Sequence, residues 1–342
     1  MKPKKVVTFG EIMLKLSPLN YQRIYQSNLM NVEYAGAEAN VAVSLANYGL
    51  EAAFVSKLPD NELGDSALNI LRHYGVNIQK VVRGGDRIGI YFSEKGASQR
   101  PSKVIYDRKG SAIANAEAND FDWDTIFDGV DWFHFTGITP ALSNSLAELC
   151  LEACRVAKAK NITISCDLNY RKKLWSREAA RKTMTAICRY VDICIANEED
   201  AADVFGIVAD NSDVGNGVID CQSYFSVARQ LQERLGFKKV AITLRESISA
   251  SDNNWSAILY DGQQVFTSRK YAIHLVDRIG GGDSFGAGLI YGLLHYGDSR
   301  QALEFAVAAS CLKQTIEGDF NLVKAGEVES LMKGNTSGRI SR

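Results

Sequence analysis

The chain of 342 residues has little of what marks several large classes of protein. No apolar run reaches the ~20 residues that a membrane-spanning helix needs, and no long apolar segment follows the first lysines, so neither a membrane span nor a secretory leader is expected. The net charge is only -1, which gives no general attraction to nucleic acid or to an acidic membrane. An anionic ligand must therefore be held by local groups.

Two kinds of motif are also missing. The seven cysteines form an odd set without Cys-x-x-Cys spacing, and Cys150 and Cys154, one helical turn apart, favour helix packing over a metal pair. A reducing cytoplasm is the simplest compartment for such a set. No Gly-Lys-Ser/Thr ending completes a P-loop, and no glycine motif fits a dinucleotide fingerprint. These two routes to nucleotide binding are excluded.

What the sequence does have is a glycine-rich turn with an acid at its end. Gly280, Gly281 and Gly282 precede Asp283 and a helical pattern over Phe285–Leu294. Glycines let bare N–H groups approach a ligand, and the first helical turn leaves its own N–H groups unpaired, so a phosphate site is predicted. A carboxylate inside an anion site indicates a base beside a transferring phosphoryl group. As an alternative, Asp283 is an ordinary N-cap.

Apolar, β-branched runs alternate with helical patterns along the chain, which predicts an α/β fold around a mostly parallel sheet. Buried strands are expected at Val6–Phe9, Ala53–Ser56, Trp132–Thr136, Thr163–Cys166, Ile193–Ala196 and Val240–Leu244. Helices are expected at Ala39–Tyr48, Leu63–Tyr74, Ser145–Lys160, Arg177–Tyr190 and Tyr224–Leu235. The polar segment over 207–222 carries no prediction.

Two segments, residues 13–34 and 87–108, interrupt the alternation of strands and helices and predict a small β-sheet lid. Within the second segment, residues 88–92 and 103–106 are expected to form exposed hairpin strands. Ligands of doubly wound folds sit beyond the carboxyl ends of the strands, which is where such a lid would close. We expect a single domain over residues 1–332, with this lid, and a disordered tail over 333–342.

Two stretches carry a resemblance to a known family. Residues 36–42, Gly-Ala-Glu-Ala-Asn-Val-Ala, and residues 277–283 resemble the two signatures of the ribokinase-like (PfkB) sugar kinases. More narrowly, four segments resemble the 2-keto-3-deoxygluconate (KDG) kinases: 90–92, 106–108, 167–171 and 318–321. The resemblance implies a three-layer α/β/α sandwich with a β lid, which often also joins two subunits. We therefore expect a homodimer or higher homo-oligomer formed through the lid.

The activity implied by the resemblance is transfer of the ATP γ-phosphate to the terminal hydroxyl of KDG, which gives 2-keto-3-deoxy-6-phosphogluconate. ATP and Mg²⁺ are the expected partners, with K⁺ as an option. Two alternatives stay open: a kinase of the same fold for fructose, ribose or a KDG epimer, and a sugar or nucleotide sensor without turnover. The presence of Asp283 argues against the sensor.

Recognition of a sugar acid needs a partner for its carboxylate, and guanidinium groups serve best. Arg108 ends a lid strand and Arg171 follows a core strand, so both can reach one cleft; the alternative is two surface arginines. Tyr91 and Tyr106 either bond sugar oxygens or are buried in a dimer contact. With the resemblance, the expected substrate-binding residues are Gly36, Ala37, Glu38, Ala39, Asn40, Tyr91, Tyr106, Asp107, Arg108, Arg171, Asp283 and Asp319.

On the nucleotide side, residues 197–200 resemble the family's Asn-x-x-Glu motif, which acts on Mg²⁺ largely through water. Asp200 replaces the glutamate, so either water spans the gap or Glu199 takes over; the alternative is two acids that open a helix. Asp277 is a candidate ligand for a monovalent cation, and residues 243–247 are expected as a nucleotide loop after a strand. The expected nucleotide-binding residues are Asn169, Tyr170, Arg171, Asn197, Thr243, Arg245, Ser247, Gly280 and Gly282.

The expected mechanism assigns separate roles to the glycine turn and to its acid. The N–H groups of Gly280, Gly281 and Gly282 stabilise charge on the transferring phosphoryl group. Asp283 orients the sugar hydroxyl and accepts its proton. Because the transition state is loose, a carboxylate of ordinary acidity is expected to suffice.

Overall fold

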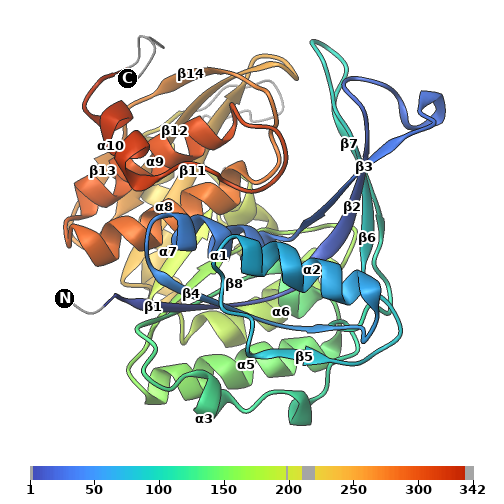
Figure 1. The fold of residues 1–342 in the computed structure, drawn as a ribbon. Coiled ribbons are helices and arrows are strands. Elements are labelled where there is room, and N and C mark those ends of the chain that lie inside the picture. Colours follow the sequence, from blue (N-terminus) through green and yellow to red (C-terminus); the bar gives the residue numbers. More distant parts are fainter. Residues whose placement is uncertain (1–2, 198, 210–219, 336–342) are drawn as a thin grey trace.

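A large sheet runs through the body of the protein (Figure 1), which is a computed structural model describing residues 3–197, 199–209 and 220–335. Its strands, in spatial order, are β13 (Val265–Thr267), β12 (Asp252–Tyr260), β11 (Lys239–Ser247), β10 (Ile193–Ala196), β9 (Thr163–Asp167), β8 (Trp132–Thr136), β1 (Lys5–Phe9), β4 (Glu51–Leu58) and β5 (Val81–Arg83), with β14 (Tyr271–His274) paired to β12. Residues 210–219 and 336–342, which include much of the polar segment and of the expected tail, lie outside the described residues.

Every pairing from β5 across to β11 is parallel, and only the edge beyond β11 is antiparallel. The prediction of a mostly parallel sheet is therefore confirmed. The six predicted strands are all present, whereas β5, β12, β13 and β14 were not predicted. Parallel neighbours align their carboxyl ends at one edge of the sheet, so the loops that follow β1, β8, β9 and β10 gather there.

Two hydrophobic cores cover the two faces of this sheet. Successive residues of β10 alternate between them: Ile193 and Ile195 belong to one core, Cys194 and Ala196 to the other. The first core packs under α1 (Ala37–Asn47), α2 (Glu62–His73), α8 (Gly281–His295), α9 (Ser299–Lys313) and α10 (Ala325–Met332). The second packs under α3 (Trp123–Ile126), α5 (Asn144–Ala159), α6 (Arg177–Cys188) and α7 (Ser223–Leu235).

The remaining helical segments are short. They are α4 (Ile138–Ala141), the 3-10 turns η1 (Ile24–Gln26) and η2 (Ala118–Asp120), and the π-helical turn η3 (Ala201–Phe205). The five helices predicted from hydrophobic periodicity all form, with ends within two residues of the expected ones. Cys150 and Cys154 are both buried on α5, which confirms their packing role, and the cysteines of the described ranges are all unbridged.

A second, smaller sheet stands beside the body (Figure 1, blue to teal). Its strands, in spatial order, are β3 (Met30–Ala35), β2 (Met13–Pro18), β6 (Ile90–Glu94) and β7 (Lys103–Asp107). The expected hairpin of β6 and β7 forms, but the expectation that both strands are exposed is wrong for β6. β6 also pairs in parallel with β2, which makes it an inner strand and buries Tyr91, Ser93 and Glu94.

Helices α8 and α9 pack against each other through small residues. A Cβ atom on Gly288 would lie 2.8 Å from Cα of Ala306, and one on Gly292 would lie 2.6 Å from Cα of Ala302. These separations show that the Gly-x-x-x-Gly spacing of Gly288 and Gly292 is a helix packing contact. Because α8 begins at the glycine turn, the contact also sets where that turn lies. None of the helices in the described residues has the length and the apolar character that crossing a membrane requires.

Gly292→Ala should separate α8 from α9. We expect the free energy of unfolding in urea to fall by roughly 1–3 kcal/mol, the usual effect of overpacking, even though alanine favours the helix itself. Gly326→Ala is the matched control, because Gly326 is also helical and a Cβ there meets nothing within 4 Å. Equal stability of the two variants would contradict this account of the packing.

Candidate active site

A cavity of about 480 Å³ opens at the carboxyl edge of the large sheet, where the small sheet faces it. Most residues predicted for substrate, nucleotide and metal contribute to its wall. These are Gly36, Ala37, Glu38, Asn40, Tyr91, Tyr106, Arg108, Asn169, Tyr170, Arg171, Asn197, Glu199, Asp200, Thr243, Arg245, Gly280, Gly281, Gly282, Asp283 and Asp319. Residues from the first and the last forty positions of the chain thus line one space.

Four predicted site residues do not line this cavity. Ala39 is completely buried in the core under α1, and Ser247 is exposed at the end of β11. Asp107 is half exposed and forms a 3.0 Å ion pair with Arg87 on the outer side of β7. Asp277 is buried behind the glycine turn.

The glycine turn has a backbone that only glycine accommodates at its centre. Gly280 has φ 81°, and a Cβ atom there would lie 2.0 Å from the backbone oxygen of Asp319. The N–H of Gly281 donates to Arg278 O at 3.3 Å. Gly282 is different, since a Cβ there would meet no atom within 4 Å. The first turn of α8 therefore presents open space and unpaired N–H groups to the cavity.

Asp283 follows this turn and receives a 2.6 Å hydrogen bond from the side-chain amide of Asn40. Burial raises the pKa of Asp283 to about 7, and the charges of Glu38 and Asp319 act in the same direction. The Asn40 hydrogen bond and the charge of Arg171 oppose that rise. The sequence argument required no more than ordinary acidity of this carboxyl, but burial is the largest effect and places its pKa well above the ordinary value.

Glu38 fastens the start of α1 to the end of β8. Its Oε1 accepts hydrogen bonds from the backbone N–H of Thr136 at 3.0 Å and from the hydroxyls of Thr136 and Thr139 at 2.7 Å each. With this oxygen occupied, Glu38 lies in the cavity wall as an anchor. Asn40, two residues further along α1, is thereby held with its amide toward Asp283.

Arg108 is buried and carries a partner that the sequence did not reveal. Its Nε donates to Oε2 of Glu11 at 2.7 Å, and its Nη2 contacts the same oxygen. Ser111 donates to the other Glu11 oxygen at 2.6 Å. Glu11 directly follows β1, so its place at a strand's carboxyl end was the signal that would have found it.

Arg171 lies in the loop after β9 and faces the carboxylates of the cavity. Its Nη1 donates to the backbone oxygen of Tyr170 at 3.1 Å, and it forms no salt bridge within the described ranges. Burial raises the pKa of both Asp167 and Asp200, and the charge of Arg171 opposes the rise in each. The guanidinium is therefore available to an anionic ligand.

The family model described as pfkB family carbohydrate kinase matches residues 3–322. The chain belongs to this family. A 2-dehydro-3-deoxygalactonokinase of Haloferax volcanii is 34% identical over 336 residues, which are 98% of each chain. A 2-dehydro-3-deoxygluconokinase of Bacillus subtilis is 27% identical over 318 residues, or 92% of this chain and 91% of the relative.

A solved structure, 2-dehydro-3-deoxygluconokinase from Thermotoga maritima, superposes with a TM-score of 0.93 at 52% identity and covers 97% of this chain and 100% of its own. A pfkB family carbohydrate kinase from Listeria grayi superposes with a TM-score of 0.89 at 32% identity, covering 96% of this chain and 100% of its own. The ribokinase-like α/β sandwich with a separate small sheet is thus the fold of this family member.

In this pfkB family kinase, the side chain of Asp200 holds the backbone of two cavity loops by accepting their N–H groups. Its Oδ1 accepts from the N–H of Tyr170 at 3.0 Å and its Oδ2 from the N–H of Asn197 at 2.9 Å. The described residues hold no group of three or more His, Cys, Asp or Glu side chains placed to bind a metal ion. A Mg²⁺ ion that keeps several waters needs only one or two carboxylates, and Glu199 and Asp167 line the cavity. These residues fit a hydrated ion held mainly by phosphate oxygens.

The prediction that residues 243–247 form a loop after a strand is wrong. These residues are the last part of β11, which runs to Ser247 and pairs with β12 in antiparallel register. Glu246, which looked like a loop residue, accepts hydrogen bonds from Asn254 at 2.9 Å and from Lys270 at 2.5 Å. Asn254 on the paired strand β12 and Lys270, which precedes β14, thus satisfy its charge, and the strand continues.

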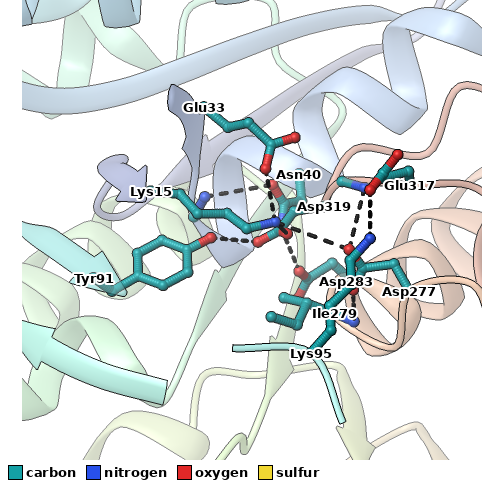
Figure 2. A network of polar contacts seen from close by, with 12 residues as sticks. Lys15, Glu33, Asn40, Tyr91, Lys95, Asp277, Ile279, Asp283, Glu317 and Asp319 are labelled. Carbon is teal, nitrogen blue, oxygen red and sulfur yellow. Dashed lines mark hydrogen bonds and ion pairs between the residues drawn. The ribbon is translucent and has the colours of Figure 1, made fainter. Parts of the chain in front are cut away.

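The small sheet is docked onto the loop before α10 by a buried lysine, as Figure 2 shows. Lys15 of β2 donates to Asp319 at 2.6 Å and pairs with Glu33 of β3 at 2.9 Å. Burial lowers the pKa of Lys15, but these carboxylates and Asp277 outweigh it and raise the pKa above its ordinary value. The hydroxyl of Tyr91 donates to the second Asp319 oxygen at 2.5 Å. Lys15 was not predicted from the sequence.

The raised pKa of Asp283 predicts a pH-dependent cost to stability. Between its ordinary value of 3.8 and about 7, the native state binds this proton more tightly than the unfolded chain, so stability falls as pH rises through that window. Asp283→Asn lacks the titrating proton. Its advantage over the wild type in urea unfolding should be small at pH 4 and largest above pH 7, reaching a few kcal/mol at most.

Asp192→Asn is the control with the opposite sign. Burial raises the pKa of Asp192, but hydrogen bonds from Lys158 and Lys238 outweigh burial and lower it. This carboxylate therefore stabilises the protein above the carboxyl pKa of the unfolded chain, and its replacement should cost stability there. If the stability difference between wild type and Asp283→Asn stays constant from pH 4 to pH 8, Asp283 does not titrate as described.

Proposed function

We propose that this pfkB family kinase transfers the γ-phosphate of ATP to the terminal hydroxyl of 2-keto-3-deoxygluconate, also named 2-dehydro-3-deoxygluconate. The observation that carries the proposal is Arg171, a guanidinium without a salt-bridge partner among the described residues, in the cavity that also holds Asp283. A neutral sugar offers such a group no carboxylate, whereas a sugar acid does. The 52% identity to the Thermotoga maritima 2-dehydro-3-deoxygluconokinase supports the same substrate.

In the proposed reaction, the γ-phosphate lies over the glycine turn. The N–H groups of Gly280 and Gly282 and the positive end of α8 stabilise charge on the transferring phosphoryl group. Asp283 accepts the proton of the sugar hydroxyl while the hydroxyl oxygen bonds to the γ-phosphorus and the bond to ADP breaks. A base with a pKa of about 7 is half ionised at neutral pH, so kcat/KM should rise with pH through that value.

The sugar lies in this proposal between α1, the small sheet and Asp319. Sugar oxygens are held by Asn40 and by the free N–H groups at the start of α1. On the side of the small sheet, the sugar ring is enclosed by Tyr91 and Asp319. Arg108 meets the substrate from a position set by Glu11, which leaves Arg171 as the main partner of the sugar carboxylate.

The nucleotide phosphates and Mg²⁺ occupy the side of the cavity formed by the loops after β9 and β10. When bound, Mg²⁺ neutralises phosphate charge. Glu199 and Asp167 are the carboxylates that would hold its water shell, and Asp200 keeps the backbone of Tyr170 and Asn197 in place. The same space is lined by Asn169, Thr243 and Arg245. We propose that these side chains contact the nucleotide.

We also infer that residues 1–332 work as one kinase unit whose small sheet is both lid and subunit contact. The outer side of that sheet exposes apolar side chains: Val32 is 63% exposed and Ile105 is 53% exposed. Apolar groups gathered on one sheet face favour burial against a second copy of the chain. A homodimer formed through this face is the assembly that we propose.

A second substrate has a specific observation in its favour. The Haloferax volcanii relative, at 34% identity over 98% of this chain, is named for the galactonate epimer. The two sugar acids share the carboxylate that Arg171 would bind and differ only at a hydroxyl-bearing carbon. The galacto epimer is therefore the first competitor to test.

The deciding experiment measures ADP release with MgATP and KDG, its galacto epimer, gluconate, fructose and ribose. We expect KDG to exceed the neutral sugars in kcat/KM by about 100-fold or more, because a half-buried guanidinium without a salt-bridge partner among the described residues favours a ligand that brings a carboxylate. Asp283→Asn should keep no more than a few per cent of the activity, since the base is lost. Preference for a neutral sugar would overturn the sugar-acid assignment and keep the kinase.

Arg171→Ala should weaken sugar acids specifically. The loss of a charge-assisted contact predicts a rise in KM for KDG of roughly tenfold or more, with less effect on any neutral sugar that turns over. Lys172→Ala is the control, because Lys172 is the neighbouring exposed cation and does not line the cavity. An equal loss on ribose and on KDG would remove the carboxylate role from Arg171.

A further inference from the structure

One face of the last turns of α9 supports the glycine turn from behind. Ser310, Lys313 and Gln314 stand three and four positions apart, hence on one helix face, and each is at most 2% exposed. The hydroxyl of Ser310 donates to Gly281 O at 2.7 Å. The backbone oxygen of Gln314 accepts from Val276 N at 2.9 Å. None of these three residues, of which Gln314 caps the end of α9, lines the cavity.

Lys313 places its ammonium group on two backbone carbonyls of this turn. Its Nζ donates to Asp277 O at 3.3 Å and to Ile279 O. Carbonyl oxygens that converge on one point repel each other unless a cation lies between them. The C=O and N–H of one peptide unit point in opposite directions. Lys313 holds the C=O of Ile279 on the side away from the cavity, so the N–H of Gly280, in the same peptide unit, points to the opposite side, where Gly280 lines the cavity.

The residues at this point do not fit the K⁺ ion for which Asp277 was a candidate ligand. Both side-chain oxygens of Asp277 already accept backbone N–H groups at 3.2 Å, one from Ile279 and one from Gly318. Its carboxylate also lies 4.0 Å from the Lys15 ammonium. A metal ion on the two carbonyls would meet Lys313 directly, with two like charges in a buried space.

We propose that Lys313 is a positioning residue that takes the place of a monovalent metal ion behind the phosphate-binding turn, so that phosphoryl transfer by this chain does not require K⁺. The ammonium carries the same charge as K⁺, and its tether to α9 keeps it in place at any salt composition. The pKa of Lys313 is lowered from its ordinary value because burial outweighs the carboxylates of Asp277 and Asp319, which act in the opposite direction. The proposal rests on the proposed function only in that the turn binds ATP phosphates.

The first test uses the unmodified full-length protein. ADP release with MgATP and KDG is measured in KCl, NaCl and tetramethylammonium chloride at equal ionic strength. We expect rates within about twofold in all three salts, because the required charge is already supplied by the protein. A fall of roughly tenfold or more on replacing K⁺ by tetramethylammonium would overturn the proposal.

The second test removes the ammonium. Lys313→Met keeps the length of the side chain, and we expect kcat to fall by about tenfold or more with KM for the sugar acid nearly unchanged, since only the phosphate side is disturbed. Lys313→Ala leaves room for an ion, so K⁺ or NH₄⁺ should restore a part of the lost rate that tetramethylammonium does not. Such rescue separates a positioning charge from a packing defect. Full activity of Lys313→Met would refute the role.

Lys239→Met is the matched control. Lys239 is a partly buried lysine of β11 that donates to the neutral hydroxyl of Ser299 at 2.9 Å. This variant should keep wild-type activity and show no response to the cation. If the Lys313 variants do not fold, the cation series on the wild type decides alone.

Binding of MgATP without sugar, followed by calorimetry in the same salts, distinguishes the two proposals. Equal affinity in K⁺ and tetramethylammonium together with no turnover of KDG would reject the substrate and retain the role of Lys313. Turnover of KDG with MgATP binding that needs K⁺ would reject the role of Lys313 and retain the substrate.

Discussion

The compensation of buried charge around the glycine turn is the constraint on which the rest of the site depends. Asp277 and Asp283 each come close enough to Asp319 for their charges to interact, and burial makes such carboxylates costly unless their charge is compensated. Lys15 and Lys313 bring positive charge to this cluster from the small sheet and from α9. Each element that reaches the cavity is thus held there partly by the need to balance charge. Asp283 has an amide as its direct partner, which is why burial can raise its pKa.

The large sheet could be predicted because its inner strands are apolar on both faces. Ile193–Ala196 is such a run, and β10 has the expected bounds. Burial on most sides had the opposite effect for helix α9, which was missed. A helix buried on most of its sides lacks the polar stripe by which helical periodicity is recognised. The end of β11 was missed because Arg245 and Glu246 resemble loop residues, and only the partners on β12 explain why charged residues continue a strand.

In the site, what could be predicted was local in sequence. Glycines followed by Asp283 at a helix start are visible in one short motif. The position of Glu11 after a strand was a usable signal, but its pairing with Arg108 and that of Lys15 with Asp319 span 97 and 304 positions, and a single sequence holds no sign of such pairs. The raised pKa of Asp283 could not be predicted, because burial is a property of the whole surroundings and not of the motif.

The ion pair of Lys15 with Asp319 also bears on how the chain reaches its native state. Synthesis proceeds from the N-terminus, so Lys15 of β2 is made 304 residues before its partner Asp319. Until then the small sheet lacks the carboxylate that docks it, and Gly280 lacks the loop behind it. A nascent or truncated chain that ends before Asp319 therefore lacks a part of the cavity wall, and the phosphate-binding turn becomes complete only after Asp319 has been made.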